Sequence, residues 1–205
     1  MRQTGRSAWW LGALALVVVA IAPLSPAAVA SAEEQFHFGN TELTFAAGGS
    51  FSHQTVGNDV EEIDGFQLLP HFGIFLSDEH GPGWIRGNVQ LIAEPTLVYL
   101  TSKSDSATAV GLSALGRWVF GAGWVVRPYV EFGLGILGGQ MNFRQTNCDV
   151  NFIIEGGPGL SWFVTDRVAL TAGYRFQHIS NASRCDQNLG INSSLFMLGV
   201  SYYFP

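Results

Sequence analysis

Charge is scarce in this chain of 205 residues. Only 13% of the residues are charged, about half of the roughly 25% that is usual in soluble domains. Disordered chains combine high charge with few aromatic residues, and 13% of this chain is aromatic, so disorder is excluded. Positive charge is the scarcer sign, with 10 Lys and Arg against 16 Asp and Glu, and Lys103 is the single lysine. Since nucleic-acid binding needs a basic patch, no nucleic-acid partner is expected.

Long hydrophobic runs are lacking as well, except at the N-terminus. There, residues 8–22 form one apolar run behind Arg2 and Arg6, and small residues at 28–32 fit the cleavage pattern of a secretory signal peptide. A membrane anchor would need about 20 apolar residues, which is longer than this run. We therefore expect a signal peptide over residues 1–32 and a mature domain over residues 33–205.

The mature sequence has a regular alternation of side chains. Eight stretches alternate apolar with polar or small residues and each is about ten residues or somewhat longer, as expected for half-buried strands. Clusters of Gly, Asn, Asp and Ser separate them. The predicted strands cover roughly residues 41–52, 64–76, 86–101, 107–120, 125–138, 149–164, 168–181 and 193–204.

Charge on these strands distinguishes a membrane barrel from a soluble, lipocalin-like barrel. Three acidic and three basic residues occupy the less apolar face: Glu94, Arg117, Arg127, Glu131, Glu155 and Arg175. Such a balanced set can pair inside a narrow lumen, where isolated charges would be costly. The opposite face is too apolar to be left in water. We predict an all-β fold, an eight-stranded antiparallel transmembrane β-barrel of the outer membrane of a Gram-negative bacterium, with a soluble barrel as the alternative.

The connections between the strands predict the orientation of the barrel in the membrane and a disulfide. Long connections at 52–64, 138–149 and 181–193 are predicted to lie outside the cell, because outer-membrane barrels keep their short turns in the periplasm. Cys148 and Cys185 fall in two of these long connections. In an oxidising compartment a pair of cysteines favours a disulfide over two free thiols.

The histidines do not predict a metal site. None of His37, His53, His71 and His80 has partners at metal-ligand spacing. We expect them to be polar side chains in loops or at strand ends, and we expect neither a metal nor a cofactor.

One polar pair stands out on the predicted membrane face. Alternation places His178 and Ser180 on the same face as Tyr174 and Phe176, where a strand in lipid gains nothing from an imidazole or a hydroxyl. A histidine base beside a serine nucleophile is the minimal ester-cleaving pair. From strand parity alone, the alternative that both side chains merely face the polar interface stays open.

The segments around this pair resemble a known family. Similarity is carried by YRFQHISNA at 174–182, NLGIN at 188–192, RPYVEFGLG at 127–135 and EGGPGL at 155–160. Together they resemble the lipid A 3-O-deacylase (PagL-type) family over about residues 85–204. The resemblance implies an outer-membrane barrel that hydrolyses an ester-linked acyl chain on lipid A of lipopolysaccharide in the outer leaflet, without a cofactor.

The resemblance also implies roles for individual residues. Ser180 would be the nucleophile and His178 its base, while Asn188, Asn181 and Gly190 would hold the oxyanion or substrate. The third member of the triad is usually an acid, but its position here is Asn192, which can orient the imidazole without supplying negative charge. Alternative functions are a non-catalytic structural barrel and a deacylase of other membrane lipids, and a homodimer stays open.

Overall fold

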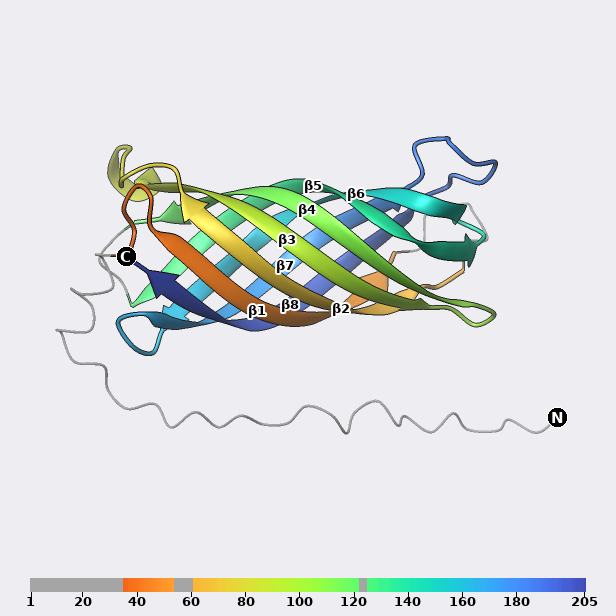
Figure 1. The fold of residues 1–205 in the computed structure, drawn as a ribbon, viewed down its shortest axis with the longest axis horizontal. Helices are drawn as coiled ribbons and strands as arrows, with labels where there is room; N and C mark the ends of the chain where they lie inside the picture. The colour runs from red at the N-terminus through yellow and green to blue at the C-terminus, as the bar shows by residue number, and fades with distance from the viewer. Residues whose placement is uncertain (1–34, 54–60, 122–124) are drawn as a thin grey trace.

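The structure is a computed structural model that describes residues 35–53, 61–121 and 125–205, so the predicted signal peptide lies outside the described residues. Eight strands follow one another: β1 (Thr41–Ser52), β2 (Asp64–Phe75), β3 (Gly87–Thr101), β4 (Ser106–Phe120), β5 (Val126–Phe143), β6 (Thr146–Phe163), β7 (Val168–Ser180) and β8 (Ile191–Phe204). Each pairs antiparallel with the next, and β8 pairs with β1 to close the barrel (Figure 1). The predicted fold class is confirmed.

The two ends of the barrel differ. The loop at 181–190 (blue) leaves the right-hand end in Figure 1, and the chain's C-terminus lies at the left-hand end. We name the end with this loop the outer end and the opposite end the periplasmic end, following the predicted orientation. The connection at 76–86, between β2 and β3, is an exception to the rule of short periplasmic turns. Within the described ranges, no helix is long and apolar enough to cross a membrane.

Alternation along each strand separates an apolar outer surface from the lumen. Phe45, Phe132 and Leu198 keep 65%, 60% and 67% of their surface exposed on the outside of the barrel. Apolar patches of this extent are not left in water by soluble proteins. The outer surface is therefore the face that contacts lipid, as the membrane barrel requires.

Ion pairs fill the middle of the lumen. All six charged residues predicted to lie there are buried: Glu94, Arg117, Arg127, Glu131, Glu155 and Arg175. The Arg175 guanidinium binds Glu94 and Glu131 with N–O distances of 2.6 Å to each. Arg117 binds Glu131 at 2.8 Å and Glu42 at 3.3 Å. Each buried charge thus has partners that replace the water it has lost.

His71 also lies in the lumen, and its predicted place in a loop or at a strand end is wrong. It occupies the middle of β2, with its imidazole nitrogens 3.5 Å from Glu42 and 3.3 Å from Glu94. Phe66 and Phe72 face outward on the same strand, so alternation turns odd-numbered residues of β2 inward. Its position in the alternation of β2 therefore determines that His71 lies in the lumen. The prediction was wrong because it considered only that histidine is polar.

The outer mouth is closed by an extension of β5 and β6. The connection predicted at 138–149 is not a long loop, because the two strands pair up to Phe143 and Thr146 and leave a two-residue turn. A register shift between Gly138 and Met141 adds one residue to β5, while odd-numbered residues such as Leu137, Met141 and Phe143 stay buried on both sides of it. The adjacent Gly138 and Gly139 favour a loop in the sequence, which is why the predicted strand ends too early. Met141 and Phe143 pack into an apolar cluster with Ile63, Ile179 and other side chains, which caps the lumen.

Candidate active site

The predicted pair, His178 and Ser180, lies at the outer end of strand β7. Ser180 is the last residue of this strand, and His178 precedes it on the same outward face as Phe176. Phe176 is 45% exposed, whereas His178 and Ser180 are half-buried. The pair therefore lies on the lipid-facing surface at the level where the barrel leaves the membrane.

His178 is held by Asn192 on the neighbouring strand. The register of β7 and β8 places the two residues directly opposite each other, and Nδ1 of His178 lies 2.7 Å from Oδ1 of Asn192. A carbonyl oxygen can only accept, so Nδ1 carries the proton and donates. In the neutral imidazole this leaves Nε2 as the acceptor, which is the form that a general base needs.

Ser180 and His178 are not joined by a hydrogen bond in the described part of the chain. They are neighbours on one face of an antiparallel strand, two residues apart. Catalytic hydrogen bonds between a nucleophile and its base often tighten only in the complex with substrate. The strand brings the Ser180 hydroxyl and the His178 imidazole to one surface, and the hydrogen bond to Asn192 fixes the orientation of the imidazole.

The loop at 181–190 shapes the other side of the pair. Its Asn181 N–H donates to Oδ1 of Asn188 at 2.9 Å, so the amide group of Asn188 is turned with its NH₂ away from Asn181 and toward Ser183, 3.3 Å from its hydroxyl. Gly190 N–H donates to the Gln145 carbonyl at 3.1 Å. The NH₂ of Asn188 carries two hydrogens and donates one of them to Ser183, so it has a second hydrogen to offer. The single backbone N–H groups of Asn181 and Gly190 both donate within the protein.

Gly190 also forms a wall beside the base. Its φ of +75° is a left-handed conformation that glycine adopts at little cost. A methyl group at this position would lie 2.6 Å from Cε1 of His178, closer than carbon atoms can approach. The position of the His178 ring is therefore tied to the path of the loop.

Backbone strain gathers directly after Ser180. Ala182 and Ser183, with φ of 52° and 60°, are the only non-glycine residues with positive φ among those that the structure describes. Such conformations cost about 1–3 kcal/mol each and persist where the surroundings hold them, commonly at functional sites. This strain is consistent with a loop whose shape is imposed on it.

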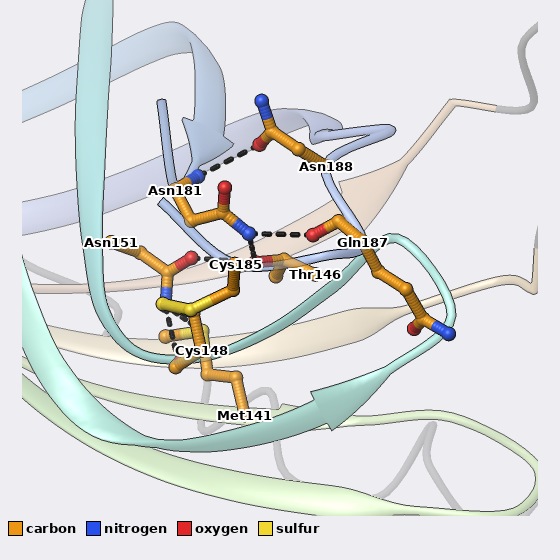
Figure 2. Close-up of a disulfide and its surroundings, with 8 residues drawn as sticks. All are labelled: Met141, Thr146, Cys148, Asn151, Asn181, Cys185, Gln187 and Asn188. Carbon is orange, nitrogen blue, oxygen red and sulfur yellow. Dashed lines mark hydrogen bonds between the residues drawn. A yellow bond between two sulfur atoms is a disulfide. The ribbon is translucent and has the colours of Figure 1, made fainter. Parts of the chain in front are cut away.

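A disulfide and a hairpin hold the loop from the outside. Cys148 near the tip of the β5–β6 hairpin is bonded to Cys185 in the loop, with a Cα–Cα distance of 5.9 Å. Figure 2 shows the bridge beside Thr146, whose hydroxyl accepts from the side chain of Asn181. Sequence reasoning missed Gln145 and Thr146, since a backbone carbonyl that accepts from a distant loop leaves no signal in the sequence.

A second polar group, to which the sequence analysis assigned no role, lies next to the pair. The Ser194 hydroxyl is 2.9 Å from Nε2 of His53 and 3.0 Å from the hydroxyl of Tyr174, and the His53 ring stacks on Phe176. Ser194 shares the outward face of β8 with Asn192, so parity was an available signal. Pairing with one another lowers the cost of placing these polar groups on a lipid-facing surface.

An apolar groove runs along the outer surface toward the periplasmic end. Strands β1, β2, β7 and β8 line it. Small residues give the groove its depth, and larger side chains form its edges: Ala47, Gly49, Ala172, Gly173, Phe66 and Leu198. It continues past Phe45, Leu170 and Val200. On β7 and β8 the groove begins at Gly173 and Phe196, toward the periplasmic end from His178 and Asn192. A groove of this composition can accept an extended hydrocarbon chain.

Metal-binding side chains do not gather anywhere in the described ranges. No group of three or more His, Cys, Asp or Glu residues could hold an ion there.

Comparison with known proteins gives both a family and a fold. The family model for lipid A 3-O-deacylase (PagL) matches residues 61–201, a range that includes the pair, Asn188 and Asn192. The chain is similar to the crystal structure of the outer membrane enzyme PagL, with a TM-score of 0.56 and 16% identity over 77% of this chain and 97% of that one. It is also similar to Neisserial surface protein A, with a TM-score of 0.55 and 18% identity over 81% of this chain and 99% of that one. No curated protein matches.

Proposed function

Because the chain belongs to the lipid A 3-O-deacylase (PagL) family of the Gram-negative outer membrane, we propose that it is a serine esterase that removes the 3-O-linked acyl chain of lipid A. The observation that carries this proposal is the 2.7 Å hydrogen bond between His178 and Asn192. It orients an imidazole two residues from Ser180, on a surface that faces lipid. A polar pair at that depth meets the ester bonds that join acyl chains to a sugar headgroup.

The reaction begins with attack by Ser180. Its Oγ attacks the ester carbonyl carbon while Nε2 of His178 takes the hydroxyl proton. Nδ1–H remains bonded to Asn192, which keeps the imidazole in the reactive tautomer and orientation. His178 then returns the proton to the sugar oxygen as the bond to the acyl carbon breaks. Water, deprotonated by the same imidazole, hydrolyses the acyl-enzyme and regenerates Ser180.

The oxyanion needs donors at the place where negative charge develops. We assign this role to the side-chain NH₂ of Asn188, which donates one hydrogen to Ser183 and has the other for the oxyanion, while the bond from the Asn181 N–H holds its carbonyl oxygen. Asn181 and Gly190 act by holding that geometry, because their backbone amides donate within the protein.

The apolar groove accounts for how a lipid is held. The acyl chain would lie along the barrel between the larger side chains that border the groove, with its carbonyl at the outer end beside Ser180. Each methylene removed from a more exposed setting contributes up to about 0.8 kcal/mol. The substrate thus approaches sideways, from within the leaflet that surrounds the barrel.

Mass spectrometry of lipid A tests the proposal. Gram-negative cells that express the wild-type chain should lose the 3-O-linked acyl group, and cells that express Ser180→Ala should keep it. Ser104→Ala, which changes a serine in the β3–β4 turn, is the matched control and should behave as wild type. An unchanged lipid A pattern with a folded wild-type barrel would favour a non-catalytic structural barrel. Release of fatty acid from phospholipids alone would make it a deacylase of other lipids.

A further inference from the structure

The loop that follows Ser180 is bound to a different hairpin, the one formed by β5 and β6. Gln145, at the tip of the β5–β6 hairpin, accepts from the N–H groups of both Leu189 and Gly190, at 2.9 Å and 3.1 Å. Thr146 forms an isolated β-bridge with Asn188. The hairpin tip therefore pairs with the end of the loop as an additional short strand.

Side chains complete the same contact (Figure 2). The fully buried Asn181 donates from its amide to the Gln187 carbonyl within the loop and to the Thr146 hydroxyl in the hairpin. Thr146 donates in turn to Oδ1 of Asn151 at 2.7 Å. The Cys148–Cys185 disulfide joins the two segments covalently across a sequence separation of 37.

We infer that the β5–β6 hairpin tip, locked by the Cys148–Cys185 disulfide, positions the catalytic loop, so that ester hydrolysis depends on the oxidised disulfide and on Thr146. This inference rests on the proposed function. The path to the reacting groups is short. Gln145 fixes the amide of Gly190, and Gly190 lies against the His178 ring, where a methyl group would be only 2.6 Å from Cε1. Asn188, which would receive the oxyanion, is held by the Thr146 bridge.

Loss of the disulfide weakens the contacts of Gln145 and Thr146 with the loop and leaves the barrel intact. Cys148 and Cys185 lie at the outer end, away from the ion pairs of the lumen, and all eight strands remain closed by their own ladders. The strained turn at Ala182 and Ser183 can relax once Cys185 is released. A displacement of about 1 Å at a catalytic group can cost about 100-fold in rate, so kcat is the quantity expected to change.

The experiment compares the oxidised and reduced forms of the whole mature barrel in detergent micelles with lipopolysaccharide. Dithiothreitol supplies two electrons and two protons to the cystine, which becomes two thiols, while the reagent closes to its own cyclic disulfide. Mass spectrometry after thiol alkylation verifies the reduction. We expect kcat for fatty-acid release to fall about 10- to 100-fold and KM to stay within about twofold, because the groove lies on other strands. The double variant Cys148→Ser/Cys185→Ser should match the reduced form and be insensitive to dithiothreitol.

Variants at Thr146 test the same path without reduction. Thr146→Val keeps the shape and removes the hydroxyl, so kcat should fall, and Thr146→Ser should restore it. Asn147→Ala, at an exposed position of the same hairpin, is the control and should retain wild-type kcat. A barrel that stays folded on unheated gels excludes general unfolding as the cause.

Each other result overturns the inference. Equal kcat before and after verified reduction rejects the role of the disulfide. A rise in KM alone indicates contact with substrate instead of positioning, and a fall in kcat that accompanies loss of the folded gel species indicates a purely structural bridge. If the oxidised wild-type barrel releases no fatty acid from lipopolysaccharide, the proposed function fails first, and the inference fails with it.

Discussion

Replacing Asn192 with a carboxylate should make the enzyme faster. Asn192→Asp has the same side-chain length and places a carboxylate oxygen where Oδ1 now lies, 2.7 Å from Nδ1 of His178. The imidazole becomes positively charged when it takes the proton from Ser180, and a neighbouring negative charge stabilises that state more than a neutral amide does. The gain therefore appears in the transition state and not in substrate binding.

The magnitude follows from the two kinds of hydrogen bond. A bond between neutral groups contributes about 1 kcal/mol, and one to a charged group about 1.5–3 kcal/mol. A difference of about 1 kcal/mol corresponds to a rate increase of about fivefold. Asn192→Ala removes the acceptor and should lower kcat about five- to tenfold. Asn192→Glu, longer by one methylene, should preserve activity or raise it.

The assay is fatty-acid release from lipopolysaccharide by the purified barrel, with kcat and KM measured separately. Ser180→Ala and His178→Ala should each abolish release, and the double variant should lose little more, because the pair acts as a unit. Asn147→Asp adds the same charge at an exposed position of the β5–β6 hairpin and should leave kcat unchanged. A lower kcat in a folded Asn192→Asp barrel would refute the assignment of Asn192 as the residue that orients the base.

Three further predictions concern other parts of the molecule. Ala172→Phe places a large ring in the apolar groove and should raise KM about tenfold by displacing about two methylenes of the acyl chain, whereas Ala114→Phe on the exposed face of β4 should not. Phe36→Ala empties the ring cluster with Phe75, Phe163 and Tyr203 at the periplasmic end and should lower the free energy of unfolding by about 3–5 kcal/mol in a urea titration; an unchanged midpoint would contradict the packing role. Arg175→Met leaves Glu94 without its guanidinium partner and Glu131 with Arg117 alone. It should cost about 3–5 kcal/mol, against little change for the exposed Arg167→Met.

Alternation predicted the barrel because it is set by a physical requirement that repeats along every strand. A side chain on a two-sided sheet faces either lipid or the lumen, so the polar class of Glu94, Arg117 and Arg175 sufficed to place them inside. The prediction failed at 138–149, where Gly138 and Gly139 favour a loop but β5 continues to Phe143 with a register shift after Gly138. Alternation itself persists on β5, since Leu137, Met141 and Phe143 are all buried. The sequence does not show that the two strands stay paired across such an irregularity.

The candidate site was predictable as far as it depends on one strand. Parity brought His178 and Ser180 to the same face, and a resemblance added Asn192 and Asn188. Contacts between hairpins could not be predicted from the sequence. The acceptor for the Gly190 N–H is the backbone carbonyl of Gln145, and every residue type has a backbone carbonyl. The contact between His53 and Ser194 could not be predicted for a related reason. It depends on the pairing of β1 with β8, which closes the barrel between the first and last strands.

The two faces of β7 explain how one short strand can serve both stability and chemistry. Arg175 and Gln177 point inward and join the buried polar network, while His178 and Ser180 lie beyond them, with His178 directed outward to Asn192. Successive residues of a strand face opposite sides, so a change at the outward positions removes no partner from the lumen. The loop after Ser180 does not have this independence. It depends on the β5–β6 hairpin for its amide acceptors, and its geometry, unlike that of the strand, is therefore set by residues far away in the sequence.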